Sequence, residues 1–207
     1  MKIIKIAWKW KNTPTKRTKT EYAVLHHSAS SVASASDIDR WHKNDGSSGI
    51  GYQFLIQKDG SIYEGRPLDT VGAHCLGYNA CSIGICFEGD FELEMPTEKQ
   101  YKAGRELLTY LKGIYPNIKV VGHKDLYATA CPGKNFDINA VLNYTEETKV
   151  KEKIYNWTTA CPEWSQSYIH KALELGYIKG DTQGNLNLTD TKIWCLVVMM
   201  RIAGIME

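Results

Sequence analysis

The chain has 207 residues, a net charge of +2, 43% hydrophobic residues and 23% charged residues. This balance is that of an ordinary globular protein of one or two domains. So small a net charge argues against a nucleic-acid-binding protein. No apolar run is long enough for a transmembrane helix or for the core of an export signal peptide.

The first predicted strand covers residues 22–28 and carries two adjacent histidines, His26 and His27, near its end. Successive side chains of a strand point to opposite faces, so only one of the two can enter a shared pocket. Val24 lies on the same face as His26, and Ala23 and Leu25 lie on the same face as His27. Both sets are apolar, so the alternation of side chains does not identify the histidine that enters the pocket. A helix is expected next, capped by Ser36 and stopped by Gly46, with His42 in a packing or hydrogen-bonding role.

Two strands at residues 51–57 and 61–64 are predicted to form a hairpin, with Tyr52 at the start of the first. The glycine-rich loop 71–79 follows and carries His74. Binding residues are disproportionately found on loops, so His74 is a candidate for substrate contact.

Residues 82–87 form a continuous apolar run that predicts a central strand. Thr97 and Gln100 have the spacing of a capping box and predict the start of a long helix. A strand at 118–121 and a short helix at 136–144 complete the region. Strands interleaved with helices around one sheet indicate an α/β domain.

A candidate metal site lies just after the strand at 118–121. His123 comes directly after Gly122, and Cys131 precedes Pro132 in the same loop. These two side chains and one histidine of the first strand would supply two nitrogens and a thiolate. Three protein ligands leave the fourth tetrahedral position for water, as in a catalytic zinc site.

The six cysteines contain no C-x-x-C pair, which favours a protein made in a reducing cytosol. Whether Cys75 and Cys81 pair is left open. Cys86 and Cys195 stand in apolar runs and are expected to be buried.

The predicted domains are residues 1–144, a linker at 145–158 and a small helical domain at 159–207. Two helices are expected in the tail, one over 165–175 and one from residue 189 or 190 to 202. The tryptophans of this region are equally consistent with a buried core and with exposed carbohydrate platforms; they are Trp157, Trp164 and Trp194.

Five motifs resemble a known family when taken together: L-H-H-S-A (25–29), G-Y-Q-F (51–54), G-A-H-x-x-G-Y-N (72–79), S-I-G-I-C (82–86) and G-H…A-C-P-G (122–133). They resemble the zinc-dependent N-acetylmuramoyl-L-alanine amidases, which include phage lysozyme-like amidases and peptidoglycan recognition proteins. The resemblance implies a central mixed β-sheet flanked by helices. It also implies hydrolysis of the amide between N-acetylmuramic acid and L-alanine of peptidoglycan.

The resemblance also implies residue roles. Zn²⁺ would be held by His26, His123 and Cys131. Tyr52 and Thr129 would donate hydrogen bonds to the oxyanion, and His74 and Asn79 would bind substrate. Cys86 stands where some amidases of this superfamily have a catalytic glutamate, so the general base is unassigned.

The tail contains the order W-x3-Y-I-x2-A-L-E-L-G-Y-I-K-G-D…G-N-L-N over residues 164–187. This order resembles a single S-layer-homology-type repeat, which implies binding to a cell-wall polymer. One copy suggests packing on the catalytic domain or self-association, so a homodimer is left open. With no export signal predicted, the expected protein is an endolysin made in the bacterial cytoplasm that acts on the wall after release. The alternatives are a spore-lysis or autolytic amidase, a cysteine peptidase using Cys131 and His123, and a non-catalytic peptidoglycan-binding protein.

Overall fold

The computed structural model describes residues 1–145, 161–180 and 185–205. The chain divides into two compact units, Met1–Lys149 and Val150–Glu207. The predicted linker at 145–158 lies, apart from its first residue, outside the described residues. Among the helices of the described part, none is long and apolar enough to cross a membrane.

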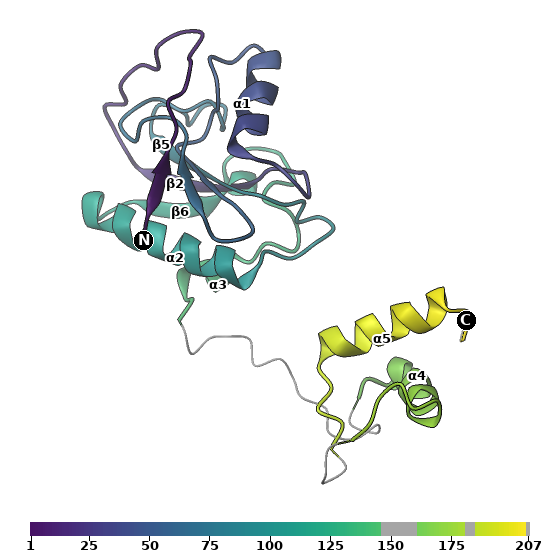
Figure 1. Ribbon diagram of the computed structural model, residues 1–207. Helices are drawn as coiled ribbons and strands as arrows, with labels where there is room; N and C mark the ends of the chain where they lie inside the picture. Colours follow the sequence, from purple (N-terminus) through teal and green to yellow (C-terminus); the bar gives the residue numbers. More distant parts are fainter. Residues whose placement is uncertain (146–160, 181–184, 206–207) are drawn as a thin grey trace. The chain divides into compact units, whose positions relative to one another are not determined.

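The first unit is built on a six-stranded mixed sheet, in the order β1-β4-β3-β5-β2-β6 (Figure 1). All neighbouring strands are parallel except β3 and β4, which form the predicted hairpin. The hairpin turns at Gly60, whose φ of +85° is readily adopted by glycine. The strands are β1 (Ile3–Lys5), β2 (Tyr22–His27), β3 (Phe54–Ile56), β4 (Ile62–Glu64), β5 (Ser82–Phe87) and β6 (Lys119–Gly122).

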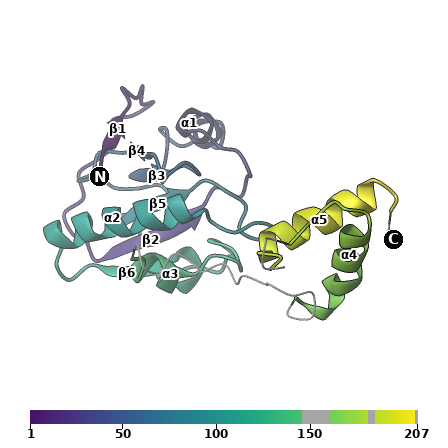
Figure 2. The same cartoon turned by 60° about the horizontal axis from the view of Figure 1, so that its bottom comes forward.

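Helices cover both faces of this sheet, which confirms the predicted α/β class. Helices α2 (Glu98–Ile114) and α3 (Ile138–Leu142) lie on one face, and α1 (Ala35–Asn44) lies on the other (Figure 2). Side chains alternate along the strands, so Leu25 and Ile85 pack toward α2 while Cys86 packs toward α1. Burial of both faces accounts for the continuous apolar sequence of β5.

Helix α2 approaches the sheet closely at Gly104. A β-carbon at this position would lie 2.9 Å from the ring of Phe87 and 2.9 Å from Val141 of α3. The predicted capping box is confirmed, since Thr97 and Gln100 each accept a hydrogen bond from the other's backbone N–H. The cap and the close packing fix α2 against the strands that carry the candidate site.

Several predicted boundaries are wrong. Helix α1 is capped by Ser34, not Ser36, and Ser34 shares a capping box with Asp37. The first hairpin strand is shorter than expected, so Tyr52 lies just before β3. The helix expected over 136–144 is limited to α3, and β6 is a half-buried edge strand that extends through Gly122. Strand β1 was not predicted.

The described part of the second unit consists of helices α4 (Glu163–Glu174) and α5 (Asp190–Ile202) with the segments beside them. Their shared core includes Tyr168, Ile169, Ile193 and Val197. Thr189 caps α5 by accepting a hydrogen bond from the backbone of Lys192. The tail prediction is wrong in two respects. Helix α4 covers Glu163–Glu174 and not 165–175, and Cys195 is exposed rather than buried.

Candidate active site

The candidate site lies where β2 and β6 end. These strands are parallel neighbours, so their carboxyl ends open at the same edge of the sheet. His26 is the penultimate residue of β2, and His123 begins a short 3₁₀ helix directly after β6. The loop then returns toward the strand end, because the backbone N–H of Lys124 donates to the carbonyl of Cys131 at 2.8 Å.

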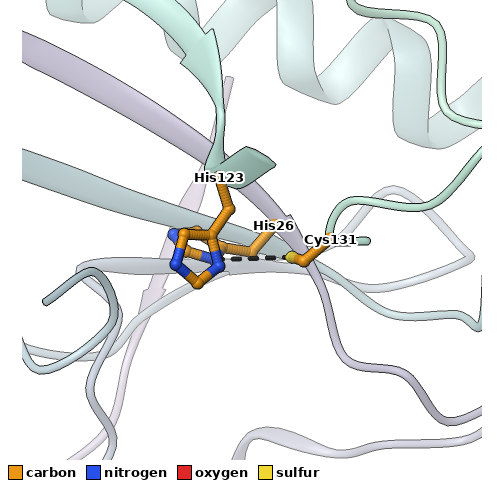
Figure 3. A group of neighbouring side chains, drawn as sticks. All are labelled: His26, His123 and Cys131. Atoms are coloured by element: carbon orange, nitrogen blue, oxygen red, sulfur yellow. Dashed lines mark hydrogen bonds between the residues drawn. The ribbon is translucent and has the colours of Figure 1, made fainter. Parts of the chain in front are cut away.

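This arrangement brings together one ligand atom from each of His26, His123 and Cys131. The three atoms all lie within 4.8 Å of one another (Figure 3). His26 Nδ1 is 3.6 Å from the Cys131 sulfur, and the centroids of the two imidazole rings are 4.5 Å apart. Two nitrogens and a sulfur at this separation match the donor types and spacing that a tetrahedral metal ion requires.

One atom of this group lacks a partner. His123 Nε2 is buried and makes no hydrogen bond, the one such side-chain atom in the part of the chain that the structure describes. A buried polar atom without a partner costs about 1–3 kcal/mol, so such an atom usually has a functional explanation. A metal ion beside His26 and Cys131 would supply that partner.

The protonation states of the donors are compatible with a metal. Burial, and next the neighbouring His74, lower the pKa of His26 well below its usual range, so this imidazole stays neutral and can donate an electron pair. Burial also raises the pKa of the Cys131 thiol to about 12. A bound cation would hold this sulfur as the thiolate, because coordination deprotonates a thiol.

His74 reaches the site from the glycine-rich loop. Its Nδ1 is 3.0 Å from Nε2 of His26, the nitrogen that faces away from Cys131. The other ring nitrogen of His74 lies 3.4 Å from the hydroxyl of Ser82, which donates to the carbonyl of Tyr78 at 2.7 Å. Metal-binding histidines commonly donate their second ring N–H to such a partner. Sequence reasoning placed His74 on a functional loop but missed this contact.

Asn79 holds the same loop in shape. Its side-chain oxygen accepts hydrogen bonds from the backbone N–H groups of His74 and Cys75, at 2.7 and 2.9 Å. The structure therefore gives Asn79 a structural role. The predicted contacts of His74 and Asn79 with substrate remain predictions.

His27 points away from the three donors. Its Nδ1 accepts a hydrogen bond from the backbone N–H of Phe91 at 3.1 Å, and its ring lies 6.0 Å from the ring of Phe91. Burial lowers the pKa of His27. The two neighbouring histidines thus face different surroundings, and His26 is the one beside His123 and Cys131.

Tyr52 lies next to the donors on the α1 side of the sheet. Its ring centroid is 5.1 Å from that of His26 and 5.2 Å from that of His42. His42 in turn accepts the backbone N–H of Gly51 at 2.8 Å, which holds this segment in place. Burial, and next Cys86, raise the pKa of Tyr52 well above its usual value, so its hydroxyl remains a hydrogen-bond donor.

Thr129 stands on the loop between His123 and Cys131. Its hydroxyl oxygen accepts the backbone N–H of Cys131 at 3.2 Å. This contact leaves the hydroxyl proton available to another acceptor. Tyr52 and Thr129 therefore offer two hydroxyl donors near the three candidate metal ligands.

The surroundings of Cys86 bear on the unassigned general base. Cys86 is fully buried and lies directly opposite His26 in the pairing of β2 with β5. Glu88, two residues further, uses its two oxygens to accept the backbone N–H groups of Ala33 and Lys58, at 3.0 and 2.9 Å. Glu88 therefore ties two loops together.

A family of known proteins matches residues 16–134, and its description is N-acetylmuramoyl-L-alanine amidase. The endolysin of Enterobacteria phage K11 is 35% identical over 132 residues, which are 60% of this chain and 86% of that protein. Peptidoglycan-recognition protein SC2 of Drosophila melanogaster is 34% identical over 148 residues, which are 64% of this chain and 80% of that protein.

Solved structures with a similar fold include proteins of the same two kinds, amidases and peptidoglycan recognition proteins. The N-acetylmuramoyl-L-alanine amidase LysC from Clostridium intestinale URNW superimposes with a TM-score of 0.66 and 38% sequence identity, covering 68% of this chain and 95% of that one. The bumblebee peptidoglycan recognition protein PGRP-SA superimposes with a TM-score of 0.63 and 30% identity, covering 70% of this chain and 96% of that one. The family match at 16–134 contains every predicted site residue and none of the second unit.

Proposed function

The chain belongs to the N-acetylmuramoyl-L-alanine amidase family, and from that membership we propose that it is a zinc-dependent endolysin. It is a peptidoglycan hydrolase that cuts the amide between N-acetylmuramic acid and L-alanine of the stem peptide. The observation that carries the zinc proposal is the convergence of three donor atoms within 4.8 Å at the ends of β2 and β6.

His26, His123 and Cys131 would hold the ion. Zinc, when bound, supplies a water whose pKa is lowered to about 7 and polarises the scissile carbonyl. The contact of His74 with Nε2 of His26 would fix the orientation of that ring and leave Nδ1 for the metal. His74 is thus proposed as a positioning residue in addition to its predicted place near substrate.

Tyr52 and Thr129 would stabilise the negative charge that develops on the carbonyl oxygen. Both carry a hydroxyl proton, and Tyr52 keeps its proton because burial raises its pKa. Preorganised donors of this kind typically contribute about 10²–10³-fold to turnover. Thr129 also orients Cys131 through the backbone bond, so its loss would affect two features of the site.

A cysteine peptidase that uses Cys131 and His123 is the less well supported alternative. An activated nucleophilic cysteine has a lowered pKa, whereas burial raises that of Cys131 to about 12. The sulfur also lies against His26, a third residue that such a dyad does not need.

The second unit is proposed to bind a cell-wall polymer. The indole rings of Trp164 and Trp194 are exposed, with centroids 4.7 Å apart, so these two tryptophans belong to the surface of the unit and not to its core. Trp157 lies outside the described residues. Since phage endolysins are among the relatives, we also propose that the protein acts on the wall after release from the cytoplasm.

Metal analysis and chelation test the zinc proposal. Purified protein should contain about one zinc per chain, as expected for one three-ligand site. Activity on cell walls should disappear after chelation and return on addition of zinc. A cysteine peptidase would stay active in chelator, while thiol alkylation would stop either enzyme. Full activity in metal-free protein would exclude the zinc mechanism.

A further inference from the structure

Helix α5 has an apolar face that no described residue of the second unit covers. Trp194, Val198 and Ile202 are spaced four residues apart and therefore lie on one side of the helix. They are 57%, 47% and 82% exposed. Cys195 and Met199 are also exposed and lie beside them around the helix. The face is formed by these five side chains and is called here the α5 face.

The opposite side of α5 is already used. Its buried side chains pack in the core shared with α4; they are Ile193, Leu196, Val197 and Met200. Arg201 is turned to α4 as well, since its guanidinium donates to the hydroxyl of Tyr168 at 2.8 and 2.9 Å. The helix is therefore apolar around most of its circumference. Helices of this kind are normally buried on all sides, and the described residues of the second unit leave the α5 face uncovered.

A hollow adjoins the α5 face. It has a volume of about 560 Å³, and Cys195 and Met199 belong both to the face and to the wall of the hollow. The remaining wall is mostly apolar; it includes Tyr177, Ile178, Leu188 and Ile205. A projecting apolar ridge beside an apolar hollow is self-complementary, which a two-fold interface between identical surfaces requires.

We propose that a second copy of this unit covers the α5 face, with the ridge of each copy entering the hollow of the other. Trp164, Leu175 and Tyr177 are exposed too, giving seven large exposed apolar side chains in the unit. A fully exposed aromatic side chain buries about 150–250 Å², and these seven side chains are 43–82% exposed. Together they can therefore supply on the order of several hundred Å², comparable with the roughly 800 Å² per partner of a stable interface.

Charge and size favour a second copy over other occupants. Seven basic and eight acidic residues follow residue 145, so two units meet without net repulsion. A helix that binds lipid usually has a polar face rich in Lys and Arg, whereas the corresponding side of α5 is buried against α4. Domains of fewer than about 70 residues often need a disulfide, a metal or oligomerisation to supplement a small core, and no disulfide joins the described cysteines.

The mass of the full-length chain in solution tests this proposal, measured by sedimentation equilibrium over a range of concentrations. The natural chain should have the mass of at least two copies. Ile202→Glu should weaken the association at least about 100-fold, because it would bury an unpaired charge in each copy. His170→Glu places the same charge on the exposed side of α4 and should leave the association unchanged.

Helical content and hydrolysis of soluble muropeptides should be equal in all three proteins, which separates loss of association from misfolding. A natural chain that sediments as a single copy would overturn the proposal. Equal association of Ile202→Glu and the natural chain would overturn it as well, since another surface would then be responsible. Binding of a monomeric natural chain to neutral or anionic lipid vesicles would identify lipid as the occupant instead.

Discussion

The two units of this chain depart from the rules of protein packing in opposite ways. The first unit buries a polar atom without a partner, Nε2 of His123, within an otherwise well-satisfied core. The second unit exposes apolar side chains along α5 that would ordinarily be buried. Each departure indicates a missing partner whose chemistry matches the surface. The first departure supports the proposed cation, and the second supports the proposed second copy.

The same difference explains why the function of the first unit is easier to predict from its sequence than the function of the second. A metal site needs a few atoms within a few ångströms, so it leaves motifs in the sequence. An association surface needs area and shape, which many sequences supply. Family membership accordingly rests on residues 16–134, and the role of the tail rests on its surface.

The strongest test of the first unit compares two adjacent residues. His26→Ala should abolish both zinc binding and hydrolysis, because it removes one of three ligands. His27→Ala should retain zinc and activity and lower stability by about 1–2 kcal/mol, since it loses the hydrogen bond from Phe91 and some packing. Metal content, turnover and denaturant unfolding of both variants provide the measurement.

The opposite pattern in these two variants would show that the metal lies on the other side of β2. Loss of zinc from both variants would instead indicate that the end of the strand unfolds. Far-ultraviolet circular dichroism distinguishes that case, because a folded sheet with a missing ligand keeps its spectrum.

A smaller effect is expected from the two hydroxyls. Tyr52→Phe and Thr129→Val should each lower turnover on soluble muropeptides by up to about 10²-fold, as for an oxyanion donor. Zinc content should stay at the natural level in Tyr52→Phe, because Tyr52 is not placed as a ligand. Thr129→Val also loses the acceptor of the Cys131 N–H, so its zinc affinity is measured beside its turnover. Turnover equal to that of the natural chain in both variants would remove these hydroxyls from the mechanism.

Local patterns in the sequence predicted most of the fold, and the errors have a common cause. The Ser34–Asp37 and Ser36–Asp39 pairs both have capping-box spacing, so the sequence alone does not choose between them. Asp39 is used elsewhere, because its side chain accepts the backbone N–H of Ile50 at 2.9 Å. Strand β1 was missed because its pairing with β4 joins residues about sixty positions apart.

In the candidate site, too, local sequence patterns predicted some features, while contacts between distant parts of the chain were missed. Strand endings and residue types indicated which side chains could meet. They could not show that His26 shares its side of the sheet with Tyr52 while His27 lies against Phe91. Nor could they show that the ring of His74, from a separate loop, reaches His26. These facts depend on how strands and loops pack, which residue spacing does not specify.

His74 should have an effect smaller than that of a ligand. His74→Ala would leave Nε2 of His26 without its partner and should weaken zinc binding by about 10–100-fold, as for other residues that orient a ligand. His74→Gln keeps an oxygen that can accept from His26 and should restore part of the affinity. Competition with a chelator measures both. Equal zinc affinity in all three proteins would leave His74 only its predicted contact with substrate.

The smallest effect on hydrolysis is expected from removal of the tail. A chain ending at Tyr144 retains the whole sheet, all three helices of the first unit and the hydrogen bond from Tyr144 to Glu98 at 3.1 Å. Its turnover on soluble muropeptides should therefore equal that of the full chain. Binding to intact walls should fall, because both the proposed polymer contacts and the multivalency of an associated tail are lost. Comparing the shortened chain with full-length Ile202→Glu separates these contributions, since the second protein keeps the polymer contacts as a single copy. Equal wall binding by the shortened and full-length chains would show that the tail does not target the wall, while leaving its self-association intact.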